Sequence, residues 1–261
     1  MSDDKLPTLK KNLARHQRLC VCYSGGVDSA FLLKMAHDVL GERAFAMIVD
    51  SATLPRRELQ SALTLAREIG ADCHVIERDI FTIPELRQNV LKRCYYCKLS
   101  EFGLIKEQAV KLGATAVADG KNADDVKAHR PGIQAADELR VISPLFEAGL
   151  TKADIRRYSR ELGLPTWEKP SHPCLSTRLP YNTEVTAELL KKIERAEEVL
   201  QKAGFREVRV RAHGDIARIE VPRENFTALT VTPRCVEELK RIGFRYITLD
   251  LEGFRSGSMD E

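Results

Sequence analysis

Apolar and polar positions change in blocks along the first half of the chain, and the blocks predict strands that alternate with helices. Apolar runs predict strands at residues 18–23, 44–50, 72–80 and 114–120. Longer segments that end in glycine predict helices at residues 28–41, 56–70 and 101–113. This order is typical of an α/β fold whose parallel sheet is covered on both faces. Ligands of such sheets bind beyond the carboxyl ends of the strands.

The pattern changes at "EKPSHPCLSTRLPYNT" (168–183), a stretch rich in proline and small polar residues that predicts an ordered loop or a domain junction. Beyond it we expect helices at 187–204 and 235–243, two strands within 206–221 and a last strand at 244–251. We therefore expect two domains. Residues 1–168 carry the parallel sheet, and residues 169–261 form a small α+β domain that includes the linking loop.

Composition adds limits on the class of protein. With 261 residues, 43% apolar and 30% charged, the chain has the composition of a globular protein. No apolar run approaches the roughly 20 residues that cross a membrane, and the first residues lack the apolar core of a signal peptide. We expect a cytoplasmic protein with no membrane partner. A net charge of +3 gives no support for nucleic acid as a partner.

The stretch "SGGVDS" (24–29) stands between the first strand and the first helix, a construction that binds anions. Gly25 and Gly26 allow the backbone to approach an oxygen closely, and Ser24 and Ser29 offer hydroxyl donors. Asp28 is the expected N-cap of the helix. The pattern of a Walker A loop is absent. A plain turn from strand to helix is the alternative interpretation.

The same string resembles the PP-loop of the ATP pyrophosphatases, which include GMP synthetase, NAD synthetase and tRNA thiolation enzymes. Members of this family cleave ATP between the α- and β-phosphates and adenylate a substrate oxygen. The resemblance implies a domain of the adenine nucleotide alpha hydrolase type that uses ATP and Mg²⁺.

Further motifs resemble the LarE family of ATP-dependent sulfur transferases over nearly the whole chain. These motifs are "RCYYCK" (93–98), "DGKNADD" (119–125), "RPG" (130–132), "SPL" (143–145), "PCLSTRLPY" (173–181), "VRVRAHGDIARIEV" (208–221) and "GFRYITLDLEGFRSGSM" (243–259). The resemblance implies adenylation of a carboxylate of a pyridinium biscarboxylate mononucleotide and its conversion to a thiocarboxylate, a step in the synthesis of the nickel-pincer cofactor. The family precedent is a homo-oligomer.

Cysteines carry the question of where the sulfur comes from. In some family members the residue that matches Cys174 gives up its own sulfur and becomes dehydroalanine. Other members have a C-x-x-C pair, here Cys94 and Cys97, and hold an iron–sulfur cluster with three ligands. Three thiolates suit a [4Fe–4S] cluster with one open iron. Zinc and a plain thiol or disulfide pair remain alternatives, because C-x-x-C alone does not separate them.

Polar residues after the predicted strands supply candidates for the nucleotide site. The family resemblance places Asp50 and Ser51 beside the base and ribose, although a helix-capping pair is an equal alternative. Asp119 and Asn122 resemble the family's nucleotide-side loop, where the carboxylates of "DGKNADD" suit Mg²⁺; a solvated acidic turn is again the alternative. Arg130 is a candidate phosphate contact.

The predicted hairpin at 206–221 has one apolar face and one ionic face, because side chains alternate along a strand. The pattern alone favours a solvated ionic face with cross-strand ion pairs. The resemblance instead favours Arg209 and Arg211 as ligands of a substrate phosphate. Glu197 and Glu220 are metal-ligand candidates near that site, with surface charge as their alternative.

Two other functions compete with sulfur transfer to a mononucleotide. One is a different PP-loop adenylating enzyme, such as a tRNA thiolase, which needs a strongly basic face or an RNA-binding module. The other is a non-catalytic nucleotide or metal sensor, which binds ATP without releasing pyrophosphate.

Overall fold

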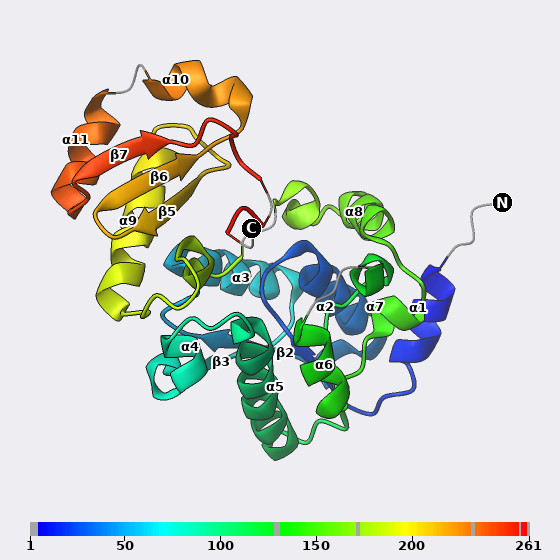
Figure 1. The fold of residues 1–261 in the computed structure, drawn as a ribbon. Helices are drawn as coiled ribbons and strands as arrows, with labels where there is room; N and C mark the ends of the chain where they lie inside the picture. Colours follow the sequence, from blue (N-terminus) through cyan, green and yellow to red (C-terminus); the bar gives the residue numbers. More distant parts are fainter. Residues whose placement is uncertain (1–4, 128–130, 171–172, 231–232, 256, 260–261) are drawn as a thin grey trace. The chain divides into compact units, whose positions relative to one another are not determined.

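The computed structural model describes residues 5–127, 131–170, 173–230, 233–255 and 257–259. Contacts divide the chain into two compact units, drawn in Figure 1. Unit 1 takes Met1–Ser51, Arg56–Arg78 and Lys92–His172, and unit 2 takes Ala52–Pro55, Asp79–Leu91 and Pro173–Glu261. The division predicted from the sequence, residues 1–168 and 169–261, makes each domain one continuous stretch, whereas each unit here consists of three segments. That these two stretches are separate domains stays a prediction.

The elements of unit 1 are α1 (Leu6–Leu13), β1 (Leu19–Cys22), α2 (Val27–Leu40), η1 (Gly41–Arg43), β2 (Ala44–Asp50), α3 (Arg56–Ile69), β3 (Cys73–Glu77), α5 (Arg93–Lys111), β4 (Ala116–Ala118), η3 (Ala123–Lys127), α6 (Pro131–Glu138), α7 (Pro144–Glu147), α8 (Lys152–Glu161) and η4 (Pro165–Glu168). The elements of unit 2 are η2 (Ile80–Thr82), α4 (Pro84–Arg87), η5 (Leu175–Arg178), α9 (Ala187–Lys202), β5 (Arg209–His213), β6 (Ile216–Glu220), η6 (Arg223–Asn225), α10 (Phe226–Thr230), α11 (Pro233–Ile242) and β7 (Tyr246–Leu249).

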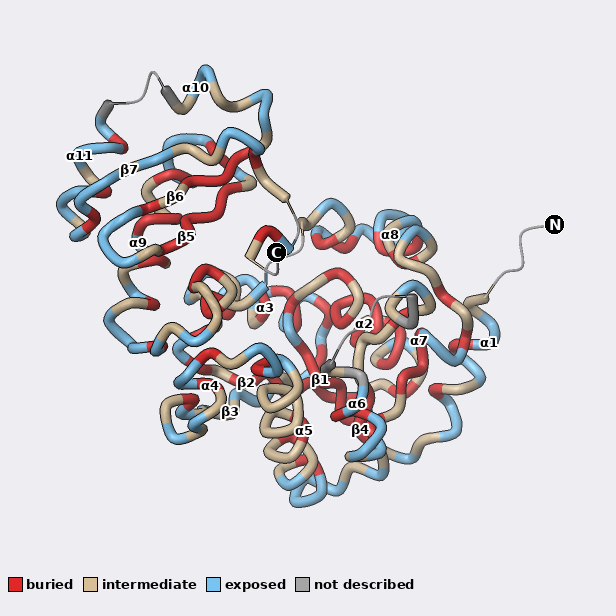
Figure 2. Tube along the Cα trace, in the orientation of Figure 1, coloured by how far each residue is buried: buried red, intermediate tan, exposed pale blue. Residues whose placement is uncertain are grey.

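The sheet of unit 1 confirms the expected α/β fold. Its strands run parallel in the order β3-β2-β1-β4, with Leu19 of β1 opposite Ala44 on one side and Ala116 on the other. Strands β1 and β2 are buried almost throughout, as Figure 2 shows, because helices cover both faces. The chain leaves β1 toward β2 on one side and later returns to β4 on the other, so the carboxyl end of β1 is the switch point where ligands bind.

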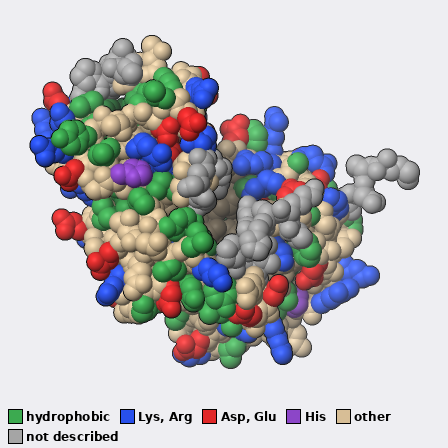
Figure 3. Space-filling model, in the orientation of Figure 1, with side chains coloured by type: hydrophobic (Ala, Val, Ile, Leu, Met, Phe, Trp, Pro, Cys, Tyr) green, Lys and Arg blue, Asp and Glu red, His purple; other side chains and the backbone are tan. Residues whose placement is uncertain are grey.

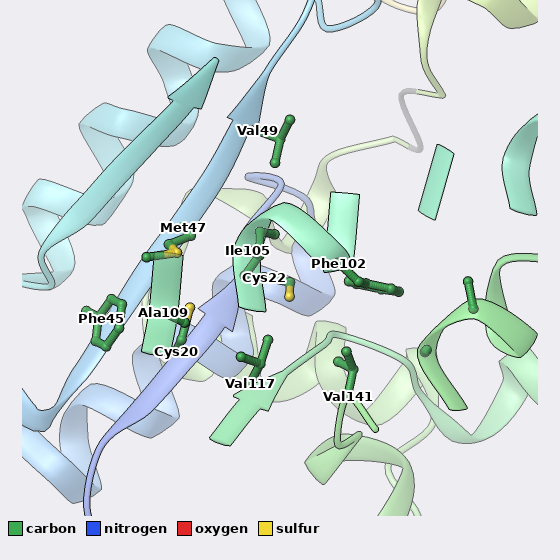
Figure 4. Packing of buried hydrophobic residues seen from close by; sticks show 12 residues of the cluster. Cys20, Cys22, Phe45, Met47, Val49, Phe102, Ile105, Ala109, Val117 and Val141 are labelled. Atoms are coloured by element: carbon green, nitrogen blue, oxygen red, sulfur yellow. The ribbon is translucent and has the colours of Figure 1, made fainter. Parts of the chain in front are cut away.

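Alternate residues of β1 and β2 point to opposite faces of this sheet. Cys20 and Cys22 join Phe45 and Met47 in a core cluster on the face covered by α5 and α6 (Figure 4). Helix α2 packs against β1 and β2 and also contacts α1, α3 and α8. It is therefore buried on more than one side, which explains why apolar residues occupy most of its positions.

Unit 2 contains the expected small α+β fold. Strands β5 and β6 form an antiparallel hairpin, and β7 adds to β6 in parallel. Helices α9 and α11 pack against each other and against this sheet. The segment 79–91 joins the unit through Asn89, whose amide donates to the carbonyl oxygens of Leu179 and Pro180 at 3.3 and 2.8 Å.

Two expectations from the sequence pattern are wrong. The helix expected at 101–113 begins at Arg93, so the C-x-x-C pair lies on α5 itself. The ionic face of the hairpin is not solvated: Arg209, Arg211 and Glu220 are 1%, 4% and 0% exposed. In the part of the chain that the structure describes, no helix is long and apolar enough to span a bilayer.

Candidate functional site

The loop "SGGVDS" lies between β1 and α2, at the switch point of the sheet. Gly26 is the N-cap of α2, and the first helical hydrogen bond runs from the Ala30 N–H to its carbonyl oxygen. The N–H groups of the first turn therefore lack helical acceptors and face the loop. Gly25 has φ +68°, and a Cβ there would lie 2.5 Å from the Cβ of Ala62 on α3. Only glycine fits that position.

The two serines of the loop are joined by their hydroxyl groups. Ser24 Oγ and Ser29 Oγ lie 3.0 Å apart, and Ser29 Oγ also donates to the carbonyl oxygen of Gly26 at 3.3 Å. The Gly26 N–H makes only a long hydrogen bond, of 3.4 Å, to Ser24 Oγ. These contacts fix the loop while leaving the Gly26 N–H weakly engaged, the arrangement that an anion needs.

Asp28 is not the N-cap that the sequence predicted, because the helix begins one residue earlier and Gly26 takes that position. Its carboxylate instead pairs with Lys152 Nζ and accepts a hydrogen bond from Asn122 Nδ2 at 3.4 Å. Lys152 is the first residue of α8, and nothing in the sequence singled it out. Asp28 thus connects the PP-loop to residues that arrive from far along the chain.

The loop after β4 packs directly on the start of α2. A Cβ on Gly120 would lie 3.0 Å from the backbone nitrogen of Ser29, so a side chain there would require this backbone to shift. Asp119 accepts hydrogen bonds from Ser143 Oγ at 2.8 Å and from the Lys121 N–H at 3.2 Å. Burial raises the pKa of Asp119, although both hydrogen bonds oppose the rise. Asn122 is 2% exposed. The structure therefore brings Asp119 and Asn122 to the PP-loop.

Asp50 and Ser51 follow β2 at the carboxyl edge of the same sheet. Arg56, at the start of α3, donates to both carboxylate oxygens of Asp50 at 2.5 and 2.8 Å and to the carbonyl oxygen of Ser51 at 2.8 Å. A forked guanidinium contact of this kind fixes the position of a carboxylate. The helix-capping alternative is not supported, since α3 begins only at Arg56.

Cys94 and Cys97 lie near the start of α5 and are three residues apart, so they share one side of the helix. Arg78, which follows β3, donates to Cys97 Sγ at 3.2 Å and to its carbonyl oxygen at 2.9 Å. The Arg78 N–H in turn donates to the Asp50 carbonyl oxygen at 2.8 Å. These contacts tie the C-x-x-C turn to the carboxyl edge of the sheet, where the PP-loop also lies.

Cys174 belongs to unit 2, where it is the N-cap of η5. The loop is held by Arg178, whose Nη1 donates to the carbonyl oxygens of Pro173 and Cys174 at 2.7 and 3.2 Å. The same guanidinium forms a forked ion pair with Glu197 at 2.8 and 3.0 Å. Arg178 therefore fixes the backbone around Cys174, while Glu197 balances its charge.

Arginines crowd the ionic face of the hairpin. Arg211 donates to Glu220 at 2.8 Å and to the Thr177 carbonyl oxygen at 2.9 Å. Arg209 lies over the ring of Phe254 at 5.1 Å. Burial lowers the pKa of Arg209 to about 10, and the guanidinium of Arg178 adds to the effect. Like charges so close together favour a bound anion.

Three buried nitrogens on this face have no hydrogen-bond partner among the described residues. They are Nε of Arg211, Nε of Arg218 and Nε2 of His213. Arg211 and Arg218 are directly opposed across the hairpin, and His213 is two residues along β5. Unsatisfied buried polar nitrogens are rare and require an explanation, such as an absent ligand or water.

The two glutamates predicted as metal ligands are both paired with arginines. Glu197 accepts from Arg178 and from the Val210 N–H, and Glu220 accepts from Arg211, Arg218 and Ser258. No group of three His, Cys, Asp or Glu side chains able to hold a metal occurs in the described part of the chain.

The predicted site residues thus fall into two sets. Unit 1 holds Ser24, Gly25, Gly26, Asp28, Ser29, Asp50, Ser51, Cys94, Cys97, Asp119 and Asn122, and unit 2 holds Cys174, Glu197, Arg209, Arg211 and Glu220. Arg130 lies outside the described residues. Sequence reasoning missed Lys152, Lys169 and Arg78, because their partners Asp28, Gly25 and Cys97 lie far from them in the sequence. It also missed Arg56, which pairs with Asp50 six residues earlier.

A glycine turn at the switch point of a parallel sheet, closed by two serines and a helix N-terminus, defines a nucleotide-binding domain of the PP-loop class. The family model of NAD synthase matches residues 7–92. The chain is 38% identical over 259 residues to the pyridinium-3,5-bisthiocarboxylic acid mononucleotide synthase of Lactiplantibacillus plantarum, covering 98% of this chain and 94% of that enzyme. It therefore belongs to the LarE family and is an ATP-dependent enzyme.

The chain is also similar to two further proteins. An uncharacterized protein of Synechocystis sp. is 40% identical over 263 residues, covering 100% of this chain and 98% of that protein. A subunit of the glutamine-hydrolyzing GMP synthase of Pyrococcus furiosus is 26% identical over 228 residues, covering 78% of this chain and 70% of that polypeptide.

Proposed function

We propose that this enzyme adenylates a carboxylate of a pyridinium biscarboxylate mononucleotide and converts it to a thiocarboxylate, a step of nickel-pincer cofactor synthesis. The observation that carries this proposal is the buried arginine face of unit 2, with its three unsatisfied nitrogens. A mononucleotide phosphate has the charge and the oxygens to satisfy them. The relative that synthesises the bisthiocarboxylic acid mononucleotide supports the same substrate class.

The PP-loop residues of unit 1 act on ATP. The N–H groups at the start of α2 and the hydroxyls of Ser24 and Ser29 bind the pyrophosphate half. A carboxylate oxygen of the substrate attacks the α-phosphorus, the bond to the β-phosphate oxygen breaks, and pyrophosphate leaves. Asp28 and Asp119 are the carboxylates of this site that suit Mg²⁺, which neutralises phosphate charge when bound. Asp50 and Ser51, positioned by Arg56, are proposed to border the ribose and base. Arg130 is proposed to contact a phosphate.

Sulfur delivery is proposed to use Cys174. In the sacrificial route its thiolate attacks the adenylated carbonyl carbon, AMP leaves, and a thioester forms. Loss of the Cα proton and cleavage of the Cβ–S bond then release the thiocarboxylate and leave dehydroalanine at position 174. Arg178 holds the backbone of this loop in place for the attack.

The second route uses Cys94, Cys97 and Cys174 together. The two thiols of α5 share one side of a helical turn, and Arg78 donates to the Cys97 sulfur, a contact that suits a metal-bound thiolate. When bound, a [4Fe–4S] cluster supplies an open iron for a transferable sulfide. The residues of unit 1 fit two ligands of such a cluster, and Cys174 is the proposed third.

We also propose Glu197 and Glu220 as metal ligands beside the substrate phosphate. Each carboxylate would have to exchange arginine partners for the cation, at the cost of leaving buried guanidinium groups unpaired. The same arginines would then turn to the substrate phosphate. Metal titration in the presence and absence of the mononucleotide tests whether the two ligands bind together.

One experiment tests the reaction itself. The purified protein is incubated with ATP, Mg²⁺ and the pyridinium biscarboxylate mononucleotide, and AMP, pyrophosphate and the mass of the mononucleotide are followed. Pyrophosphate released only with the mononucleotide, together with the mass gain of an oxygen-to-sulfur exchange, supports the proposal. ATP binding without pyrophosphate release supports a sensor.

A tRNA thiolase is the other competing function. On the face drawn in Figure 3, Lys and Arg side chains are interspersed with Asp and Glu, whereas RNA-binding proteins gather basic side chains on one surface. Thiolation of tRNA by the purified enzyme would support this competitor. We further propose, from the family precedent, a cytoplasmic homo-oligomer, which light scattering on the purified protein tests.

A further inference from the structure

We propose that Lys169 is a positioning residue that holds the Gly25–Gly26 peptide with its N–H turned toward the pyrophosphate. This inference rests on the proposed role of the PP-loop. Lys169 Nζ donates to the Gly25 carbonyl oxygen at 3.0 Å and pairs with Glu58 Oε2 at 2.6 Å. The residue is 144 positions away from Gly25 in the sequence.

The geometry of the peptide bond gives this contact its meaning. The Gly25 C=O and the Gly26 N–H belong to one trans peptide, so they point in opposite directions. With the carbonyl oxygen held by Lys169, the N–H must face the other side of the loop. A flipped peptide would instead direct the carbonyl oxygen to that side, where it would repel an anion.

A peptide between two glycines needs such a restraint. Neither residue has a Cβ to limit its backbone angles, so both orientations of the plane are sterically accessible. The Gly26 N–H has only a long contact of 3.4 Å with Ser24 Oγ, which does little to fix the peptide. Among the described residues, Lys169 therefore supplies the one short, charge-assisted hydrogen bond to the Gly25 carbonyl oxygen.

Lys169 is itself held from two sides. Glu58 lies in the first turn of α3, four residues before Ala62, the residue that contacts Gly25. Both therefore lie on the face of α3 that meets the loop. From α8, the Arg156 guanidinium donates to the carbonyl oxygens of Trp167 and Lys169 and fixes the backbone of this segment. The Lys169 and Glu58 side chains are each 16% exposed, so water weakens their pair little.

The test measures binding of inorganic pyrophosphate with Mg²⁺ by calorimetry, without ATP or mononucleotide. Lys169→Met is expected to bind pyrophosphate roughly tenfold more weakly, the effect of losing one charge-assisted hydrogen bond. Lys106→Met is the matched control. Lys106 Nζ also donates to a backbone carbonyl oxygen of unit 1, that of Leu139, but neither residue belongs to the PP-loop. Unchanged affinity in a folded Lys169→Met protein would overturn the proposal.

Glu58→Gln separates positioning from direct contact with the anion. If Lys169 holds the peptide, loss of its carboxylate partner loosens it, and pyrophosphate binds more weakly. If the ammonium instead binds pyrophosphate itself, the same change frees it and binding tightens. Weaker binding supports the proposal, and unchanged or tighter binding contradicts it. This variant also serves if Lys169→Met does not fold.

Two further readouts complete the experiment. The amide resonance of Gly26 in ¹⁵N-glycine-labelled protein should move on pyrophosphate addition in the wild type and move less in Lys169→Met. Lys169→Arg, which keeps a charged donor, should recover part of the affinity. If the wild-type protein does not bind pyrophosphate, the proposed function of the PP-loop fails; if it binds and the variants bind equally, only the role of Lys169 fails.

Discussion

Arg178 and Glu197 form a forked ion pair, 2.8 Å from Nε to Oε1 and 3.0 Å from Nη2 to Oε2, in which the side chains are 1% and 7% exposed. The pair links the loop of Cys174 to helix α9. Because Glu197 also accepts the Val210 N–H, its carboxylate connects three elements of unit 2.

Breaking this pair is expected to destabilise unit 2. Arg178→Met leaves a buried carboxylate with only the Val210 N–H, and the loss of one partner of a buried pair costs about 3–5 kcal/mol of unfolding free energy. Urea unfolding measures the loss. Arg241→Met is the control, since Arg241 pairs with Glu237 on the exposed side of α11 at 3.7 Å; its effect should stay within about 0.5 kcal/mol. Equal effects of the two changes would contradict the account.

The two glycines of the PP-loop should respond differently to substitution. Gly25→Ala requires a positive φ and places a Cβ 2.5 Å from Ala62, so it should lower the melting temperature. At Gly26 a Cβ would lie 3.4 Å from Ser24 Oγ, an ordinary contact. Gly26→Val should therefore fold but block the approach of pyrophosphate and abolish its substrate-dependent release. Normal release by a folded Gly26→Val protein would refute the assignment of the loop.

The arginine face should discriminate between the two ligands. Arg209→Ala and Arg211→Ala should weaken mononucleotide binding more than ATP binding, by roughly 10- to 150-fold for a loss of about 1.5–3 kcal/mol. Equilibrium binding of each ligand measures the ratio. Arg211→Lys keeps the charge beside Glu220 and separates loss of binding from loss of folding. Small, equal effects on both ligands would mean that the arginines serve only structure.

The three cysteines give separate patterns for the two sulfur routes. In the cluster route, Cys94→Ala, Cys97→Ala and Cys174→Ala each lose most of the iron and acid-labile sulfide after anaerobic purification. In the sacrificial route only Cys174→Ala abolishes transfer, and the used protein is lighter by the mass of H₂S. Adenylation should survive in all three variants. Sulfur transfer by Cys174→Ala would contradict both routes.

His213 should make the stability of unit 2 depend on pH. Burial, followed by the charge of Arg218, lowers the pKa of His213 below its ordinary 6.5. As the pH falls below 6.5, the unfolded chain binds a proton that the folded histidine does not, so the free energy of unfolding falls. Urea midpoints at pH 8 and pH 5.5 measure this loss. His213→Gln should lose less stability over the same interval; an equal loss would show that other groups dominate.

Local sequence was sufficient where an element depends on its own residues. Strand β2 occupies residues 44–50 as expected, because its apolar run ends at Asp50. The start of α5 was not predicted, because "RCYYCK" is a poor helix former by composition. Tertiary contacts hold this turn in the helix, including the hydrogen bond from Arg78 to the Cys97 carbonyl oxygen. Helices α6, α7 and α8 were not predicted at all.

The site shows the same division. The PP-loop could be recognised from a six-residue string, since backbone groups in one turn make it. Lys152 and Lys169 could not, because their partners in the loop lie 124 and 144 residues away. The burial of the arginine face was also hidden, since residues 177 and 258, far from the hairpin in sequence, contact Arg211 and Glu220.

The scattered origin of unit 2 has a consequence for synthesis on the ribosome. Its segment 79–91 is translated long before residues 173–261, which include the carbonyl oxygens that Asn89 binds. Strand β4, the last of the parallel sheet, is complete at Ala118. Chains grow at about 5–20 residues per second. All strands of the parallel sheet are therefore synthesised several seconds before Leu179 and Pro180, the residues that Asn89 binds. The sheet of unit 2 is completed later still, because β7 must be translated before it can pair with β6.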